Sequence, residues 1–172
     1  MASQHACAVQ REESARRAVE KIQSADWQLA CQGLAECAII ADVEQTENLL
    51  DLELLIPALI QHLGSLRSAV VKETLLCLDV LLARRASEFK EFVSSDTSSL
   101  FYALLERSSF DKKFVMSSAR NTLSLLVRSV PTPLLLSAAV ELTEHSRAQF
   151  REQVAVVIHE ALLAMEIQEP EV

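Results

Sequence analysis

The stretch Leu66-Arg67-Ser68-Ala69-Val70-Val71 decides the fold, because a related pattern returns three more times along the chain. The matching stretches lie at spacings of about 40, 45 and 80 residues and begin at Asp26, Asp111 and Ser146. Further downstream, the same register aligns Cys37, Cys77, Thr122 and Val157. Repeats of about 35 to 45 residues are typical of helical hairpins that stack on one another.

The spacing of apolar residues is helical nearly everywhere, and a sustained alternation of period two is missing from the sequence. We therefore predict an all-α chain with helices over residues 12–26, 27–43, 47–63, 67–87, 89–108, 112–129, 132–145 and 147–166. These helices would pair into about four HEAT-like hairpins. One hairpin cannot bury its apolar face alone, so we expect the hairpins to stack as a short α-solenoid.

Short polar residues and helix breakers mark several limits of these helices. Asp26 and Asp111 each precede a predicted helix, where an aspartate can accept hydrogen bonds from the first free N–H groups. Gly64 follows a helix, as a C-terminal glycine does. Pro57 lies inside a predicted helix, which indicates either a kink or two shorter helices that meet there. The Ser-rich stretch 94–99 indicates either a loop or an N-cap within the fifth helical region.

Composition limits the class of protein. The chain has 172 residues, of which 50% are hydrophobic and 23% charged, so it can build one globular domain or one short array. Only 2 glycines are present, which disfavours a sheet protein and a phosphate-binding loop. We expect a single domain over residues 12–166, a flexible N-terminus over 1–11 and a frayed acidic tail over 167–172.

Charge and hydropathy also limit the partners. The formal net charge is -8, which disfavours binding to nucleic acid. No apolar run is long enough to span a membrane, and the first residues do not resemble a secretory signal. We therefore expect neither nucleic acid nor membrane as a partner.

The residues that could do chemistry are scattered. The four histidines and four cysteines form neither a paired zinc spacing nor a C-x-x-C motif. Cys37 and Cys77 share one repeat register, so we expect both thiols to pack in the core. The sequence predicts no catalytic site, no metal and no cofactor, and hence a protein that is not an enzyme.

In an array of hairpins, the turns inside the hairpins lie on one edge. We place these turns at about 24–27, 64–67, 108–112 and 145–147, and the register makes Trp27, Arg67, Lys112 and Arg147 equivalent. An aromatic anchor followed by cations favours an acidic protein partner. The predicted binding residues are Trp27, Arg67, Lys72, Lys112, Lys113, Arg147 and Arg151. As alternatives, Trp27 covers the core of the first repeat, and the cations are merely solvated.

Some of these residues are similar to a known family. Asp26-Trp27-Gln28-Leu29, Gly33-Leu34 and Leu66 to Glu73 resemble the TOG domains of microtubule regulators of the CLASP and crescerin (TOGARAM) type. The stretch from Phe114 to Arg128 and the connection Val130-Pro131-Thr132-Pro133 are similar to the crescerin type. The resemblance covers about residues 12–165, although a usual TOG domain has six hairpins rather than four.

The resemblance implies a HEAT array whose turn edge binds αβ-tubulin or microtubules and regulates their dynamics or organisation. It implies that Trp27 packs against tubulin and that the cations face acidic surface. The expected location is the cytoplasm and its cytoskeleton, with the cilium or flagellum as the alternative. The alternative function is a HEAT- or armadillo-like interaction scaffold without tubulin binding. Asn48 and Asn121 are the only asparagines, which disfavours the asparagine ladder of an armadillo groove.

Overall fold

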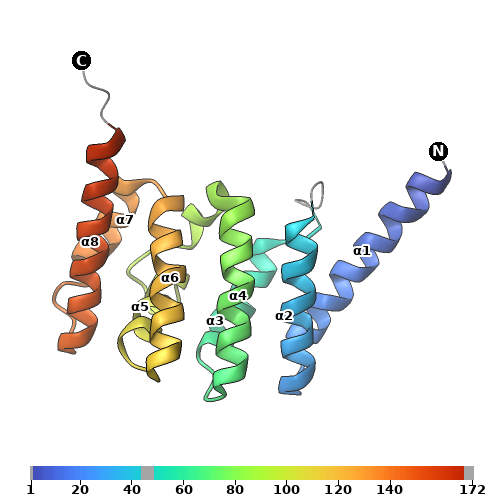
Figure 1. The fold of residues 1–172 in the computed structure, drawn as a ribbon, viewed down its shortest axis with the longest axis horizontal. Coiled ribbons are helices and arrows are strands. Elements are labelled where there is room, and N and C mark those ends of the chain that lie inside the picture. The colour runs from blue at the N-terminus through green and yellow to red at the C-terminus, as the bar shows by residue number, and fades with distance from the viewer. Residues whose placement is uncertain (1, 44–48, 169–172) are drawn as a thin grey trace. The chain divides into compact units, whose positions relative to one another are not determined.

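The computed structural model describes residues 2–43 and 49–168, and the side chains of residues 9–43 and 49–165. Within these ranges all regular structure is helical and no strand occurs, which confirms the all-α prediction (Figure 1). The chain divides into two compact units, Met1–Arg84 and Arg85–Val172, here called the N-terminal and C-terminal units. The single domain predicted over residues 12–166 stays a prediction.

The N-terminal unit holds two helical hairpins. Helices α1 (Ala2–Ile22) and α2 (Trp27–Asp42) form the first, and α3 (Leu52–Leu63) and α4 (Ser68–Arg85) form the second. The carboxylate of Asp26 accepts a hydrogen bond from the backbone N–H of Gln28 at 2.8 Å, so the predicted N-cap is confirmed. Gly64 is the C-cap of α3, also as predicted.

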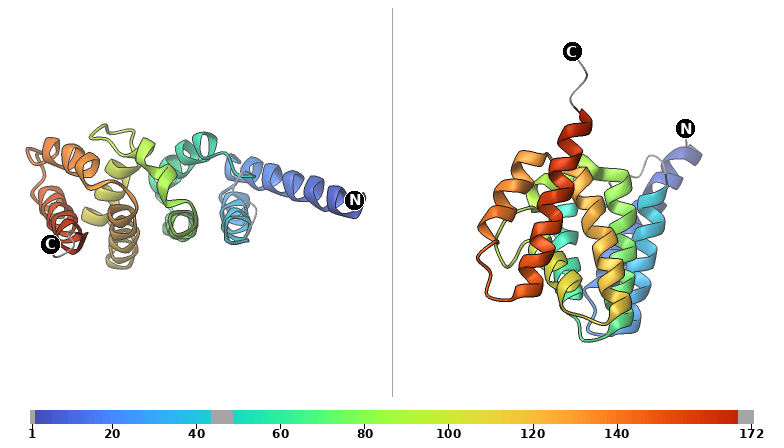
Figure 2. Two further views of the ribbon diagram at one scale, coloured as in Figure 1. Left: turned by 90° about the horizontal axis from the view of Figure 1, so that it is seen from above. Right: turned by 60° about the vertical axis from the view of Figure 1, so that its left-hand side comes forward.

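The two hairpins of this unit stack with the same orientation. At one end of the stack, a ring nitrogen of His62 in α3 lies 2.6 Å from the carbonyl oxygen of Ile22 at the end of α1. At the other end, Arg84 of α4 forms an ion pair with Asp42 of α2 at 2.7 Å. Helices α2 and α4 lie side by side in each view of Figures 1 and 2. The turns inside the two hairpins therefore share one edge of the unit.

The first hairpin is unusually close at Gly33. A Cβ atom built on Gly33 would lie 2.6 Å from the carbonyl oxygen of Ala18 and 2.8 Å from the backbone nitrogen of Ile22. Ala18 and Ile22 are themselves fully buried. A glycine inside a helix costs stability, so its presence here follows from the close approach of α1 to α2.

The C-terminal unit starts with a 3-10 helix, η1 (Ala86–Phe92), and continues with two hairpins. Helices α5 (Leu100–Ser109) and α6 (Lys113–Ser129) form one, and α7 (Thr132–Glu141) and α8 (Ala148–Gln168) form the other. Both α5 and α6 contact α8. The aromatic core of this unit includes Phe89, Phe101 and Phe150, all of them fully buried.

Several predicted boundaries are wrong. Helix α1 begins at Ala2 rather than at residue 12, while the flexibility predicted for residues 1–11 stays a prediction. The predicted helix 89–108 is replaced by η1 and α5, and the Ser-rich stretch between them supplies the N-cap Ser99. This cap accepts a hydrogen bond from the N–H of Tyr102, which starts α5 only at Leu100.

Three smaller predictions also need comment. Lys112 rather than Asp111 is the N-cap of α6, and the Asp111 carboxylate pairs with Arg107 at 2.8 Å while it accepts a hydrogen bond from the Lys112 N–H at 2.7 Å. Pro57 lies within the continuous helix α3, so two separate helices do not form there. Of the predicted frayed tail, residues 167 and 168 belong to α8, and residues 169–172 lie outside the described part of the chain.

The prediction that Cys37 and Cys77 pack in the core is confirmed, since both are fully buried. Burial raises the pKa of the Cys37 thiol to about 12 and also raises that of Cys77. A thiol of high pKa is a poor nucleophile. These two cysteines therefore serve as small apolar groups of the core.

Candidate partner-binding edges

The turn edge of the N-terminal unit is built around an arginine that stacks on a tryptophan. The guanidinium carbon of Arg67, in the turn before α4, lies 5.1 Å from the centre of the Trp27 ring in the first turn of α2. The Ser65 hydroxyl accepts a hydrogen bond from the Arg67 N–H at 3.2 Å, which fixes the turn locally. Two of the predicted binding residues are therefore in direct contact.

This edge leaves both apolar and cationic groups at the surface. Trp27 is 37% exposed and Leu66, in the neighbouring turn, is 99% exposed, so the indole is not sealed within the core. Arg67 and Lys72 are exposed, and neither forms an ion pair with a carboxylate among the described residues. The arrangement offers a partner apolar contact area beside unneutralised positive charge.

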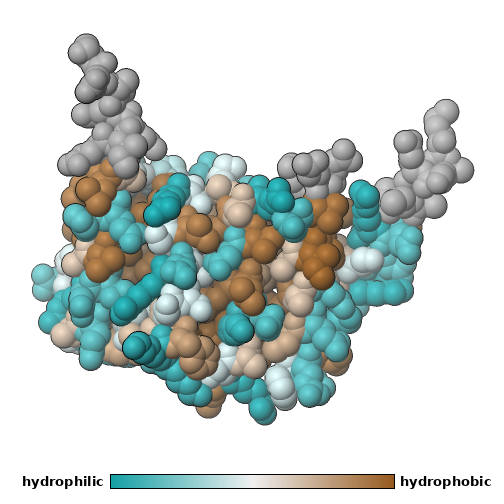
Figure 3. Space-filling model, viewed as in Figure 1, coloured by the Kyte–Doolittle hydropathy of each residue, from teal (hydrophilic) through white to brown (hydrophobic). Residues whose placement is uncertain are grey.

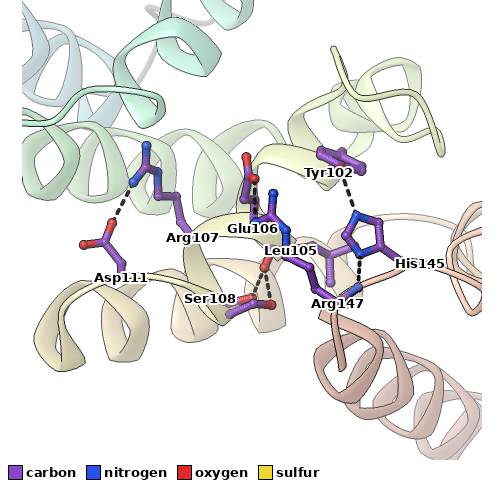
Figure 4. A network of polar contacts seen from close by, with 9 residues as sticks. Tyr102, Leu105, Glu106, Arg107, Ser108, Asp111, His145 and Arg147 are labelled. Carbon is purple, nitrogen blue, oxygen red and sulfur yellow. Dashed lines mark hydrogen bonds and ion pairs between the residues drawn. The ribbon is translucent and has the colours of Figure 1, made fainter. Parts of the chain in front are cut away.

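The C-terminal unit repeats the same motif with different residues. The guanidinium carbon of Arg147, in the turn before α8, lies 4.6 Å from the centre of the Phe110 ring, which follows α5. Arg147 also forms an ion pair with Glu106 at 3.4 Å (Figure 4). In this unit the carboxylate of Glu106 partly neutralises the arginine.

A cluster around His145 holds the turn between α7 and α8. The His145 ring stacks on Phe150 with ring centres 4.0 Å apart, and its Nε2 lies 3.2 Å from the hydroxyl of Tyr102 (Figure 4). The carbonyl oxygen of His145 accepts a hydrogen bond from Arg151 at 2.6 Å. Arg151, a predicted binding residue, thus contributes to the internal structure of this turn.

The remaining two predicted binding residues lie at the start of α6. Lys112 is the N-cap and makes no side-chain cap hydrogen bond, and Lys113 begins the helix. Both are exposed, and Phe114 beside them is 53% exposed. The seven predicted residues are therefore divided, with Trp27, Arg67 and Lys72 in the N-terminal unit and Lys112, Lys113, Arg147 and Arg151 in the C-terminal unit.

Sequence reasoning left three exposed or stacking residues out of the binding set. Phe110 is the ring on which Arg147 stacks, and Leu66 and Phe114 are exposed apolar side chains at the turns. For Leu66, the sequence did contain a signal of exposure, because this leucine lies in the short turn between Ser65 and the start of α4. The repeat register alone does not tell a solvent-facing apolar residue from one that packs inside.

No protein-family model matches the chain, and no curated protein matches it either. Among the described residues, no group of three or more His, Cys, Asp or Glu side chains could hold a metal ion. In the same part of the chain, every helix is too short or too polar to cross a membrane. The case for a function therefore depends on the geometry of the two edges.

Proposed function

We propose that this protein is a TOG-like HEAT array that binds αβ-tubulin through the turns of its helical hairpins and so regulates microtubule dynamics or organisation. The observation that carries the proposal is the Trp27–Arg67 pair at 5.1 Å, which lies on the turn edge of the N-terminal unit. Buried aromatic and arginine side chains dominate the energy of protein interfaces. This pair supplies both kinds of side chain in one place.

The chemistry of the edge fits an acidic protein surface with apolar hollows. Arg67 and Lys72 carry positive charge, and Leu66 and Trp27 supply the apolar contact. The net charge of -8 opposes association with an acidic partner over the whole molecule. Steering therefore requires the cations to be gathered at the edge, because exposed charges beyond about 10 Å are largely screened at physiological salt.

The test is size-exclusion chromatography of the purified chain mixed with αβ-tubulin. The wild-type protein should co-elute with tubulin, whereas the double variant Trp27→Glu/Arg67→Ala should elute alone while its circular dichroism stays helical. A matched control makes the same two kinds of change away from the turn edge. Ile39 is 67% exposed and Arg84 lies at the other end of α4, so Ile39→Glu/Arg84→Ala should still co-elute.

Co-elution of Trp27→Glu/Arg67→Ala with tubulin at wild-type strength would contradict the claim that the Trp27–Arg67 edge binds tubulin. Failure of the wild-type chain to co-elute, with capture of another protein that requires Trp27, would instead support the interaction scaffold without tubulin binding. In that second case Trp27 and Arg67 would still be binding residues, but their partner would be a protein other than tubulin.

A further inference from the structure

Two of the second helices of the hairpins, α2 and α6, each carry charged residues of one sign, whereas α4 and α8 carry both signs. Helix α2 contains Glu36 and Asp42 and no basic residue. Helix α6 contains Lys113, Arg120 and Arg128 and no acidic residue. A helix with only positive charges is unexpected in a chain whose net charge is -8.

The three cations of α6 lie on one face of the helix. Their spacings of seven and eight residues correspond to about two helical turns each, which is roughly 10–12 Å along the axis. All three are exposed, and so are Ser117 and Asn121 between them. Figure 3 shows hydrophilic side chains interrupted by apolar ones over the face on which α6 lies. Together these five residues define what we call the α6 strip.

The cations of the α6 strip are not neutralised inside the protein. Lys113, Arg120 and Arg128 form no ion pair with a carboxylate of the described residues. Arg120 donates from Nε to the carbonyl oxygen of Ser108 at 3.2 Å, and this contact leaves the outer N–H groups of the guanidinium for other acceptors. By contrast, ion pairs with carboxylates hold Arg16, Arg17, Lys21, Arg84, Arg85, Lys90, Arg107 and Arg147.

The start of α6 also opposes local helix preferences. A helix N-terminus carries partial positive charge and is stabilised by acidic residues. Here the N-cap is Lys112, the next residue is Lys113, and the first turn has no acidic residue. The Asp111 carboxylate accepts a hydrogen bond from the Lys112 N–H at 2.7 Å at this helix start, whereas the side chain of Lys113 adds a positive charge in the first turn.

We propose that the α6 strip is a docking surface for an acidic peptide segment of a partner protein. Carboxylates about three residues apart in an extended segment would be spaced by roughly 10 Å, which matches the cations of the strip. The Ser117 and Asn121 side chains can donate hydrogen bonds to the same segment. The surface shares only Lys113 with the predicted turn edge, so this proposal does not depend on tubulin binding.

A polypeptide suits the strip better than a nucleic acid does. The three cations are spaced by roughly 10–12 Å along the helix, a spacing that carboxylates three residues apart in an extended peptide can match, whereas duplex nucleic acid carries one phosphate charge for about every 1.7 Å of its axis. The choice between these two partners is one that binding measurements can make directly.

The experiment measures fluorescence polarisation of a labelled peptide made of Glu-Glu-Gly repeats on titration with the full chain. Arg120→Gln/Arg128→Gln should weaken binding by roughly three- to tenfold, as expected for the loss of two exposed charge contacts. The control Arg16→Gln/Arg17→Gln removes the same charge from α1 and should bind like the wild type. Raising the salt concentration should weaken wild-type binding and reduce the difference between the variants.

Equal peptide affinity of the wild type and Arg120→Gln/Arg128→Gln would overturn the proposal, and so would equal binding of a Gln-Gln-Gly peptide. Tighter, strip-dependent binding of single-stranded oligothymidine would overturn the assignment to a peptide. A second measurement uses Lys113→Glu, which should raise the thermal midpoint through the helix dipole while weakening the peptide complex. A lower midpoint with unchanged peptide affinity would contradict both parts of the argument.

Discussion

Each unit contains an arginine stacked on an aromatic ring, but the two pairs differ in how far their side chains are exposed and neutralised. In the N-terminal unit, Arg67 stacks on Trp27, whose side chain is 37% exposed. Arg67 itself forms no ion pair with a carboxylate of the described residues. In the C-terminal unit, Arg147 stacks on the half-buried Phe110 and also pairs with Glu106 at 3.4 Å. The arginine of this contact is thus left without a carboxylate partner in the first unit and is paired with one in the second, among the described residues.

The contacts that hold the two edges differ as well. Close backbone packing at Gly33 brings α1 against α2 in the N-terminal unit, and this packing uses no side chain of the edge. In the C-terminal unit the turn is held by the rings of Tyr102, His145 and Phe150, which lie directly behind the edge. Backbone packing therefore supports the first edge without using its aromatic residue, which stays partly exposed.

The largest effect is expected from Phe150→Ala. This ring is fully buried and stacks on His145, so its removal leaves a cavity and should lower the free energy of unfolding by about 3–5 kcal/mol. Urea denaturation followed by circular dichroism measures the loss. The matched control is Phe114→Ala, since Phe114 is 53% exposed and the same change there should cost less than about 1 kcal/mol. Equal losses for the two variants would contradict the described role of the aromatic cluster.

Gly33→Ala tests the support of the other edge. The added methyl group would lie 2.6 Å from the Ala18 carbonyl oxygen, so α1 and α2 must separate, and we expect a loss of about 2–3 kcal/mol. The control is Gly64→Ala, where the new carbon would lie 3.1 Å from the Gln61 carbonyl oxygen at an ordinary φ of -69 degrees. Chemical denaturation should rank Gly33→Ala as the more damaging, and the reverse order would show that the hairpins are not held by this approach.

A comparison of Trp27→Ala with Phe110→Ala in tubulin binding tests whether only the first unit presents its aromatic residue to a partner. If the proposed function holds, Trp27→Ala should weaken the complex by about 2 kcal/mol, or roughly 30-fold, as the loss of an interface hot spot does. Phe110→Ala should cost less than about 0.5 kcal/mol, because its ring is half-buried and the arginine that stacks on it is paired with Glu106. Sedimentation with assembled microtubules gives both affinities. Equal losses would mean that both units present their aromatic residues alike.

Much of the fold was predictable, because the positions of helices depend largely on local sequence patterns. The helical period located α2, α4 and α6 within a few residues, and Asp26 and Gly64 lie at the caps where the sequence placed them. The predicted helix 89–108 ran across the break between η1 and α5, although the Ser-rich stretch 94–99 within it indicated either a loop or an N-cap. Ser99 is the N-cap of α5, so a new helix begins there.

The sequence predicted which residues of the candidate site occupy equivalent repeat positions, but not which of them are free of internal ion pairs and hydrogen bonds. Repeat alignment placed Arg67 and Arg147 at equivalent positions, and each does stack on an aromatic ring. It could not foresee that Glu106 pairs with Arg147, because these residues are 41 positions apart and come together only through the packing of the unit. Nor could it foresee that Arg151 donates to the His145 carbonyl six residues earlier, because that contact depends on the geometry of the turn.

The smallest effect concerns two adjacent arginines at the boundary of the units. Arg84 pairs with Asp42 of the N-terminal unit, and Arg85 pairs with Glu88 of the C-terminal unit at 2.6 Å. The hydrogen bond from Arg85 lowers the pKa of Glu88 below its ordinary value. The stability from this pair is therefore present above the unfolded-state pKa of about 4.3 and is lost as the pH falls through the lower folded-state value.

Because the Glu88 side chain is 46% exposed, solvent screens the pair and only a few tenths of a kcal/mol are expected. Glu88→Gln should lower the free energy of unfolding by that amount at about pH 7 and by less at about pH 3, which lies below the unfolded-state pKa. Urea denaturation at the two pH values checks the sign. A loss that grows on acidification would mean that Glu88 stabilises η1 through its neutral form, and that the contact with Arg85 does not hold the start of the C-terminal unit.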